Sequence, residues 1–180
     1  ALIRKADKDV FFCLSTNGLY LPRYAKEIAE LGVDYVTVTV NALTSNTGAH
    51  IYSFVNDAGK KYVGQEAAEL LLNRQLEGLQ LLGSYGVKVK INTVAIPSVN
   101  MEEIPAIARR MAVLGCKLHN ILPMLPVEGT AFAHLAEPEA QKIAALREVC
   151  QQWMPQMRHC RRCRADAVGT LAAACCGEEQ

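Results

Sequence analysis

The sequence lacks the short motifs that mark several common classes of enzyme. It contains no Gly-x-Gly-x-x-Gly, no phosphate-binding loop signature and no His-Glu-x-x-His. Each motif places glycines or ligands where a dinucleotide, a nucleoside triphosphate or a catalytic zinc ion binds. Their absence argues against a function built on any of these three sites.

Long apolar runs and an excess of one charge are also absent. No run of about 18 apolar residues is present, so we expect no membrane-spanning helix. The formal net charge is +1, which implies no general attraction to nucleic acid or to an acidic membrane surface. The first nine residues have neither the apolar core nor the cleavage site of a signal peptide. Because the chain does not start with Met and opens in a helix-like pattern, we expect it to be part of a longer polypeptide.

Cysteine is the residue type that is present in an informative pattern. The seven cysteines are Cys13, Cys116, Cys150, Cys160, Cys163, Cys175 and Cys176. Their odd number and the adjacent final pair do not fit a disulfide framework, and the composition favours a cytoplasmic protein. The thiols are therefore buried hydrophobes, catalytic groups or metal ligands.

Cys160 and Cys163 are the strongest candidates for metal ligands. They lie three positions apart in a segment with four arginines, residues 158–169. Cationic neighbours lower a thiol pKa, and the thiolate is the form that binds a metal. Thiolates suit iron, copper(I) and zinc, so the residues leave the metal open. A cysteine such as Cys13, within an apolar run, is more often a core hydrophobe.

The order of apolar segments predicts an α/β fold. Strands are expected at residues 10–14, 35–40, 87–96 and 117–123, and helices at residues 22–31, 65–85, 101–114 and 137–153. Four alternating βα units predict a parallel sheet with right-handed crossovers. Residues 42–63 are expected to be irregular, as in a lid or binding loop.

Polar residues recur near the carboxyl ends of the predicted strands. They are Ser15, Thr16, Asn17, Asn41, Asn92, Thr93, His119 and Asn120. Ligands of parallel α/β folds bind at this edge, and asparagine suits a polar small molecule. The alternative is that these residues only terminate strands and turns. For His119, between apolar neighbours, a core histidine with a satisfied ring is the expected outcome.

Five segments resemble the NifB family of radical S-adenosylmethionine (SAM) proteins, which act in nitrogenase cofactor assembly. They are FCLSTNGL at residues 12–19, DYVTVTVN at 34–41, KINTVAIP at 90–97, HNILP at 119–123 and CRRCRADAVG at 160–169. The resemblance implies a partial (β/α)6 barrel of the radical SAM type. Residues 1–157 would be an incomplete barrel of about four βα units, and residues 158–180 a tail that ligates clusters.

The resemblance also implies an activity and its residues. In this family SAM is cleaved at a [4Fe–4S] cluster to give a 5′-deoxyadenosyl radical, and a SAM methyl carbon becomes a carbide. Two [4Fe–4S] precursor clusters fuse around it into the eight-iron precursor of the nitrogenase cofactor. Cys13, Cys160 and Cys163 would ligate precursor clusters, and Ser15, Thr16, Asn17 and Asn92 would face SAM. Iron–sulfur cluster donors and nitrogenase cofactor assembly proteins would be the partners.

One departure from the family pattern limits these expectations. The Cys-x-x-x-Cys-x-x-Cys motif that holds the SAM-cleaving cluster is absent, as is the glycine-rich segment that follows it. We therefore expect this chain alone to be inactive in SAM cleavage. Two other functions stay open: an iron–sulfur cluster carrier or scaffold without chemistry, and a zinc-stabilised α/β binding domain.

Overall fold

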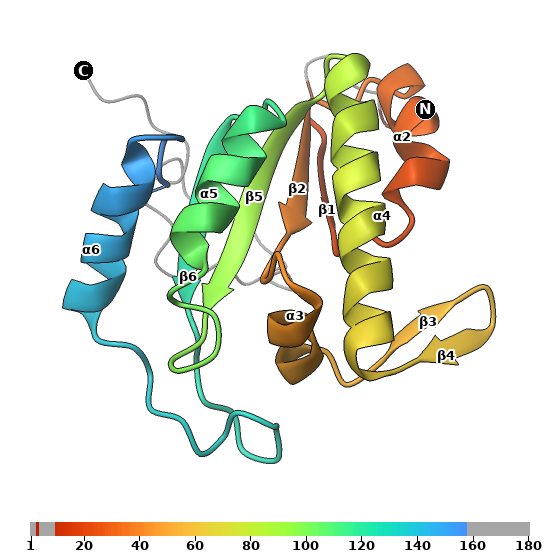
Figure 1. Ribbon diagram of the computed structural model, residues 1–180. Helices are drawn as coiled ribbons and strands as arrows, with labels where there is room; N and C mark the ends of the chain where they lie inside the picture. Colours follow the sequence, from red (N-terminus) through yellow and green to blue (C-terminus); the bar gives the residue numbers. More distant parts are fainter. Residues whose placement is uncertain (1–2, 4–9, 158–180) are drawn as a thin grey trace.

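A single parallel sheet forms the centre of the computed structural model, which describes residue 3 and residues 10–157. Its strands are β1 (Cys13–Thr16), β2 (Tyr35–Thr39), β5 (Lys88–Ala95) and β6 (Leu118–Pro123), in the order β1-β2-β5-β6 (Figure 1). Every neighbouring pair is parallel. The predicted α/β class and the βα alternation are thereby confirmed.

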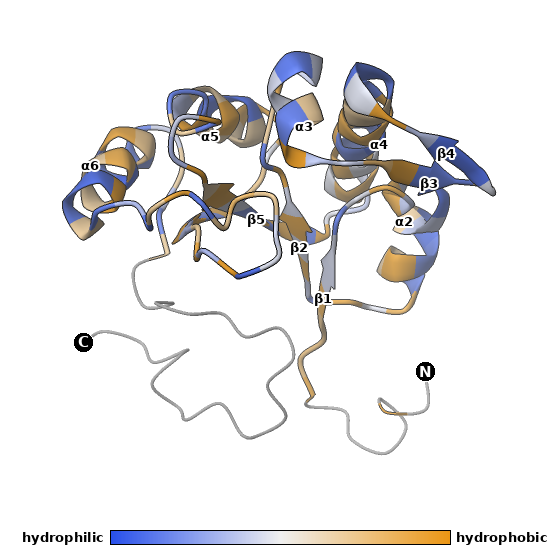
Figure 2. Ribbon diagram, turned by 90° about the horizontal axis from the view of Figure 1, so that it is seen from below, coloured by the Kyte–Doolittle hydropathy of each residue, from blue (hydrophilic) through white to orange (hydrophobic). Residues whose placement is uncertain are grey.

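Helices cover one face of this sheet (Figure 2). They are α2 (Leu21–Glu30), α4 (Gly64–Ser84), α5 (Ile104–Val113) and α6 (Ala140–Gln151). α2 and α5 each carry a proline in the first turn, where the missing N–H removes no helical hydrogen bond. Within the described part of the chain, no helix is both long and apolar enough to cross a bilayer.

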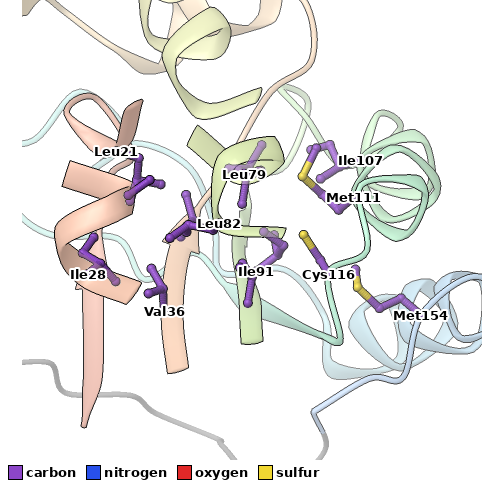
Figure 3. Close-up of a cluster of buried hydrophobic side chains, with 14 residues drawn as sticks. Leu21, Ile28, Val36, Leu79, Leu82, Ile91, Ile107, Met111, Cys116 and Met154 are labelled. Atoms are coloured by element: carbon purple, nitrogen blue, oxygen red, sulfur yellow. The ribbon is translucent and has the colours of Figure 1, made fainter. Parts of the chain in front are cut away.

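The apolar core lies between the sheet and these helices (Figure 3). Alternate residues of the strands point to it, because successive side chains in a strand face opposite sides. Val36 and Ile91 meet Leu21, Leu79, Leu82, Ile107 and Met111 in one cluster. Burying each such side chain contributes roughly 1.5–3 kcal/mol. The helical face therefore carries much of the stability of the sheet.

The contact between α2 and α4 depends on one small residue. A Cβ atom added at Gly78 would collide with the Cβ atom of Leu21. Glycine lets the two helices approach more closely than any larger residue would allow. Because the helices lie this close, Leu21 and Ile28 of α2 can pack against the strand residues of the core.

The prediction that residues 42–63 are irregular is wrong. This segment forms helix α3 (Ser45–Ile51) and a hairpin of β3 (Val55–Asp57) and β4 (Lys60–Tyr62). The Thr44 hydroxyl caps α3 by accepting a hydrogen bond from the Thr47 amide at 3.2 Å. The hairpin turns through Ala58 and Gly59, both with positive φ, as tight hairpins require. These elements are too short for hydrophobic periodicity to reveal them.

The predicted position of the first strand is also wrong. The apolar run at residues 10–14 suggested that Cys13 ends the strand, whereas β1 starts at Cys13 and ends at Thr16. The pairing with β2 sets this register, with Cys13 opposite Tyr35 and Thr16 opposite Val38. Cys13 therefore lies at the amino end of β1, one strand length from the carboxyl edge.

Candidate functional site: the open face of the sheet

The face of the sheet opposite the helices is mainly polar. We call it the open face and define it by the strand residues that alternate with the core residues. They are Cys13 and Ser15 on β1, Tyr35, Thr37 and Thr39 on β2, Lys88, Lys90, Asn92 and Val94 on β5, and Leu118, Asn120 and Leu122 on β6. Figure 2 shows that α2, α4, α5 and α6 all lie on the other side. This polar surface is where a ligand can meet side chains from several strands at once.

Two of the four residues predicted to face SAM lie on the open face. Ser15 is exposed beside Thr37, and Asn92 is half-buried on the inner strand β5. Thr16 is on the opposite side, and its hydroxyl accepts a hydrogen bond from the Gly18 amide at 3.1 Å. The Asn17 side chain shapes the same turn, accepting from the Leu19 amide at 3.0 Å.

Asn92 on β5 and Asn120 on the edge strand β6 form a pair of amides on the open face. The Nδ2 atom of Asn120 donates to Oδ1 of Asn92 at 3.3 Å. Asn120 is fully buried, and its Oδ1 atom has no hydrogen-bond partner among the described residues. An unsatisfied buried acceptor costs about 1–3 kcal/mol. The Oδ1 atom of Asn120 is therefore an acceptor that the described chain leaves without a partner.

Of the three described cysteines, only Cys13 is placed and exposed as a ligand would be. Its Sγ atom lies on the open face, 3.7 Å from the Thr37 hydroxyl. Burial raises the pKa of the Cys116 thiol to about 12 and that of the Cys150 thiol to about 11. Both stay protonated at neutral pH in the helical core, whereas Cys13 is not the core hydrophobe that its apolar run favoured.

The described residues do not by themselves make a metal centre. No group of three or more His, Cys, Asp or Glu side chains in this part of the chain is arranged to hold a metal ion. Cys160 and Cys163, the predicted cluster ligands, lie outside the described residues.

The described chain reaches the sheet again just before Cys160. The His119 amide donates to the Pro155 carbonyl at 2.9 Å, and the Met157 amide donates to the His119 carbonyl at 2.8 Å. The bridge between His119 and Gln156 is parallel. Residues 155–157 therefore run beside β6 in the direction of its carboxyl end, and Met157 precedes Cys160 by three positions.

Sequence reasoning missed Gln75, which fixes the carboxyl ends of β1 and β2. Its Nε2 atom donates to the Asn17 carbonyl at 2.7 Å and to the Thr39 carbonyl at 2.9 Å. Gly18, with φ of +89°, passes so close that an added Cβ would lie 2.7 Å from the Gln75 Cγ atom. The sequence did contain a signal for Gln75. It lies four residues after Leu71 and four before Leu79, so it is a polar residue on the buried face of α4.

Asn41 does not face a ligand but holds the carboxyl ends of β2 and β5 together. Its Oδ1 atom accepts from the Val94 amide at 2.9 Å. Asn100 donates through Nδ2 to the carbonyls of Asn41 and Val94, and accepts from the Ile96 amide. Asn41 therefore serves the strand ends, as the alternative in the sequence analysis held, and its side chain also forms a hydrogen bond with Tyr52.

His119 is a core histidine, as the sequence predicted, but its ring is not fully satisfied as expected, because Nδ1 has no partner in the described chain. Its ring Nε2 lies 2.9 Å from the Thr93 hydroxyl, which donates its only proton to the Val40 carbonyl at 2.7 Å. Nε2 must therefore carry the proton, which leaves Nδ1 as a bare, buried acceptor without a partner in the described chain. Burial lowers the pKa of His119 to about 4, so the ring is neutral at pH 7.

Comparison with known proteins agrees with this geometry. The family model described as the Radical SAM superfamily matches residues 1–111. The FeMo cofactor biosynthesis protein NifB of Klebsiella pneumoniae is 45% identical over 174 residues, which are 94% of this chain and 37% of that protein. The NifB proteins of Bradyrhizobium diazoefficiens and Chlorobaculum tepidum are 43% and 41% identical, over 95% and 94% of this chain.

The chain spans only part of these relatives, namely 37%, 35% and 40% of their respective lengths. The matched family covers well over half of the chain, including the strands β1, β2 and β5 that build the open face. The chain therefore belongs to the radical SAM superfamily, with NifB proteins among its homologues, as the resemblance of its motifs predicted.

Proposed function

We propose that this chain is part of a radical SAM maturase that acts in the biosynthesis of the nitrogenase iron–molybdenum cofactor. The open face is the observation that carries the proposal: a mainly polar sheet surface with an accessible cysteine, a hydrogen-bonded amide pair and no helix over it in the described chain. The NifB relatives, whose names state a role in FeMo cofactor biosynthesis, support the same assignment.

SAM would bind on the open face with Asn92 and Ser15, and the turn of Thr16 and Asn17 would form the rim. When bound, SAM would supply the methyl carbon that becomes a carbide and, at a reduced [4Fe–4S] cluster, a 5′-deoxyadenosyl radical. The residues of this chain would bind and orient it. Asn92 offers donors, and the unpartnered Oδ1 of Asn120 offers an acceptor.

The precursor [4Fe–4S] clusters would be substrates, held by Cys13, Cys160 and Cys163. Cys13 is on the open face, and its neighbour Thr37 is neutral, so no fixed carboxylate of β1 or β2 opposes an anionic cluster. The parallel bridge at Gln156 directs the chain along β6 just before Cys160. Iron–sulfur cluster donors and nitrogenase cofactor assembly proteins would deliver and receive the clusters.

Anaerobic reconstitution with iron and sulfide tests cluster binding. We expect the chain to take up both and to develop the broad visible absorption of thiolate-bound iron–sulfur clusters. Cys13→Ala and the double variant Cys160→Ala with Cys163→Ala should each lose iron and absorption. Cys116→Ala is the matched control, because that thiol is buried in the helical core and should not affect iron content.

The same samples separate the alternatives. Stoichiometric zinc binding without iron uptake would contradict the proposal and favour a zinc-stabilised binding domain. Cluster assembly without binding of S-adenosylhomocysteine would favour a cluster carrier. With SAM and dithionite, we expect no 5′-deoxyadenosine from this chain, because it contains no Cys-x-x-x-Cys-x-x-Cys.

A further inference from the structure

Gln75 belongs to the helical layer but reaches the ends of two neighbouring strands. The pairing of β1 with β2 stops at Thr16 and Val38. The carbonyl oxygens of the next two residues, Asn17 and Thr39, instead accept hydrogen bonds from Nε2 of Gln75 at 2.7 and 2.9 Å. One side-chain amide therefore bridges the two strands at the point where their own pairing ends.

The surroundings of Gln75 fit this bridge closely. The side chain is buried, and both protons of its Nε2 atom are used by the two carbonyls. Gly18 lies against it, because an added Cβ would come within 2.7 Å of the Gln75 Cγ atom and 3.2 Å of Val38 Cγ1. Gly18 also has a φ of +89°, which side chains rarely allow. The turn therefore rests directly on the Gln75 side chain.

The segment that Gln75 holds in place is the rim of the proposed SAM site, residues 15–17. Within it, the Thr16 hydroxyl and the Asn17 side chain accept hydrogen bonds from backbone amides of the turn. These bonds set the shape of the turn, whereas the bridge from Gln75 sets its distance from Thr39, a residue of the open face on β2. A ligand that contacts both strands depends on that distance.

We propose that Gln75 is a positioning residue for SAM, which holds residues 15–17 at the distance from β2 that binding requires. The proposal rests on the proposed function, because it requires SAM to bind to the open face beside this turn. Gln75 is buried in the helical layer, on the other side of the sheet, so it acts through the two carbonyls and does not touch the ligand. A rim that is already ordered binds a ligand with a smaller loss of conformational entropy.

Calorimetric titration of the full 180-residue chain with S-adenosylhomocysteine tests this role. Gln75→Met keeps the length of the side chain but cannot donate a hydrogen bond, so the turn is released from β2. We expect Kd to rise about fivefold, the scale of the cost of ordering a few groups on binding. Leu82→Val is the matched control, because Leu82 is a core residue seven positions further along the buried face of α4. It should lower the free energy of unfolding and leave Kd unchanged.

Hydrogen exchange of the Gly18 and Leu19 amides reports on the turn itself. Both amides donate to side chains within the turn. We expect them to exchange faster in Gln75→Met than in the unsubstituted chain or in Leu82→Val. Unchanged exchange would mean that the turn holds its place without Gln75, which contradicts the proposal.

A second variant serves if Gln75→Met does not fold. Gln75→Glu has nearly the same shape, but an ionised carboxylate cannot donate and would repel both carbonyls. Burial raises the pKa of a carboxyl group, and the protonated form regains one donor. S-adenosylhomocysteine should therefore bind to this variant more tightly at pH 6 than at pH 8, and to the unsubstituted chain equally at both. The same affinity of Gln75→Glu at both pH values, equal to that of the unsubstituted chain, would contradict the role.

The outcomes separate the role of Gln75 from the proposed function. If the unsubstituted chain binds S-adenosylhomocysteine and Gln75→Met binds it equally well, the positioning role is wrong and the proposed function stands. An equal loss of affinity in Leu82→Val would mean that binding follows overall stability, which also overturns the role. If the unsubstituted chain binds no S-adenosylhomocysteine, SAM does not bind to this face, and the proposed function fails together with the role of Gln75.

Discussion

The two faces of the sheet are built from the same strands but have opposite characters. On the helical face, Val36, Val38 and Ile91 are completely buried in one apolar cluster. On the open face, the residues between them in the sequence are Thr37, Lys90 and Asn92, which offer hydroxyl, ammonium and amide groups. A strand only five to eight residues long thus contributes to the core and to the candidate site at the same time.

Because of this difference, the helical face should determine the free energy of unfolding, and the open face should determine ligand binding. Side chains on the helical face are fixed by packing against α2, α4 and α5, and changes there should alter the free energy of unfolding. On the open face, Cys13 and Ser15 are exposed, so substitution of Ser15 should cost little stability, whereas Thr37 and Asn120 are buried. The two faces should therefore respond very differently to substitution and to pH.

Acidification should have the largest effect, through His119 on the helical face. The ring is neutral when folded, with a pKa of about 4 against 6.5 in the unfolded chain. The unfolded state therefore binds the proton first, and stability falls as the pH drops from about 6.5 to about 4. The shift corresponds to a loss of about 3 kcal/mol at the usual 1.36 kcal/mol per pH unit.

Urea unfolding between pH 7 and pH 4 measures this loss. The control is His119→Gln, whose amide nitrogen can still donate to Thr93 but does not titrate. The variant should lose less stability over the same interval than the unsubstituted chain. Parallel pH profiles for the two proteins would show that the buried ring does not set the acid limit.

The substitution Gly78→Ala should have the next largest effect. The new methyl group would collide with Leu21 and push α2 away from α4, which disturbs the packing over the strands. Overpacking of this kind should lower the free energy of unfolding by about 2.5 kcal/mol. Gly83→Ala on the same helix is the control, because its Cβ would meet only the Leu114 carbonyl oxygen at 3.6 Å. A stable Gly78→Ala variant would mean that the two helices can separate at little cost.

On the open face, Ser15→Ala should have the smallest effect. Ser15 is exposed, and its neighbour Thr37 forms its contact with Cys13 and not with Ser15. We expect the free energy of unfolding to change by less than about 0.5 kcal/mol, as for most surface substitutions. Urea unfolding at pH 7 measures this change. A loss as large as that of Gly78→Ala would remove the distinction between the two faces.

The sequence revealed the elements whose pattern is long enough to be read. The helix α4 and the strand β5 were predicted to within one residue at either end, because their apolar residues repeat over many positions. The hairpin of β3 and β4 was missed because each strand has only three residues. The register of β1 was missed because pairing with β2, a contact distant in sequence, sets it.

The candidate site shows a similar division. The predicted position near the carboxyl ends of the strands is right for Ser15 and Thr16, but Asn92 lies in the middle of β5 and His119 and Asn120 lie near the start of β6. The sequence also could not tell which side of the sheet each residue faces. The side chains of Asn41 and Thr16 accept hydrogen bonds from backbone amides, whereas Asn92 and Ser15 lie on the open face. The Gln75 side chain donates a hydrogen bond to the Asn17 carbonyl, although the two residues are 58 positions apart in the sequence. Only the structure reveals this contact.

The different positions of the three described cysteines have a consequence for the chemistry of the chain in air. Oxidation to sulfenic acid or to an intermolecular disulfide requires access to the sulfur atom. Cys116 and Cys150 are shielded inside the core, whereas Cys13 meets dissolved oxygen and peroxide directly. Exposure to air would therefore remove a proposed cluster ligand while the fold stays intact. A sample purified aerobically would therefore keep the circular dichroism spectrum of the folded chain but would bind less cluster.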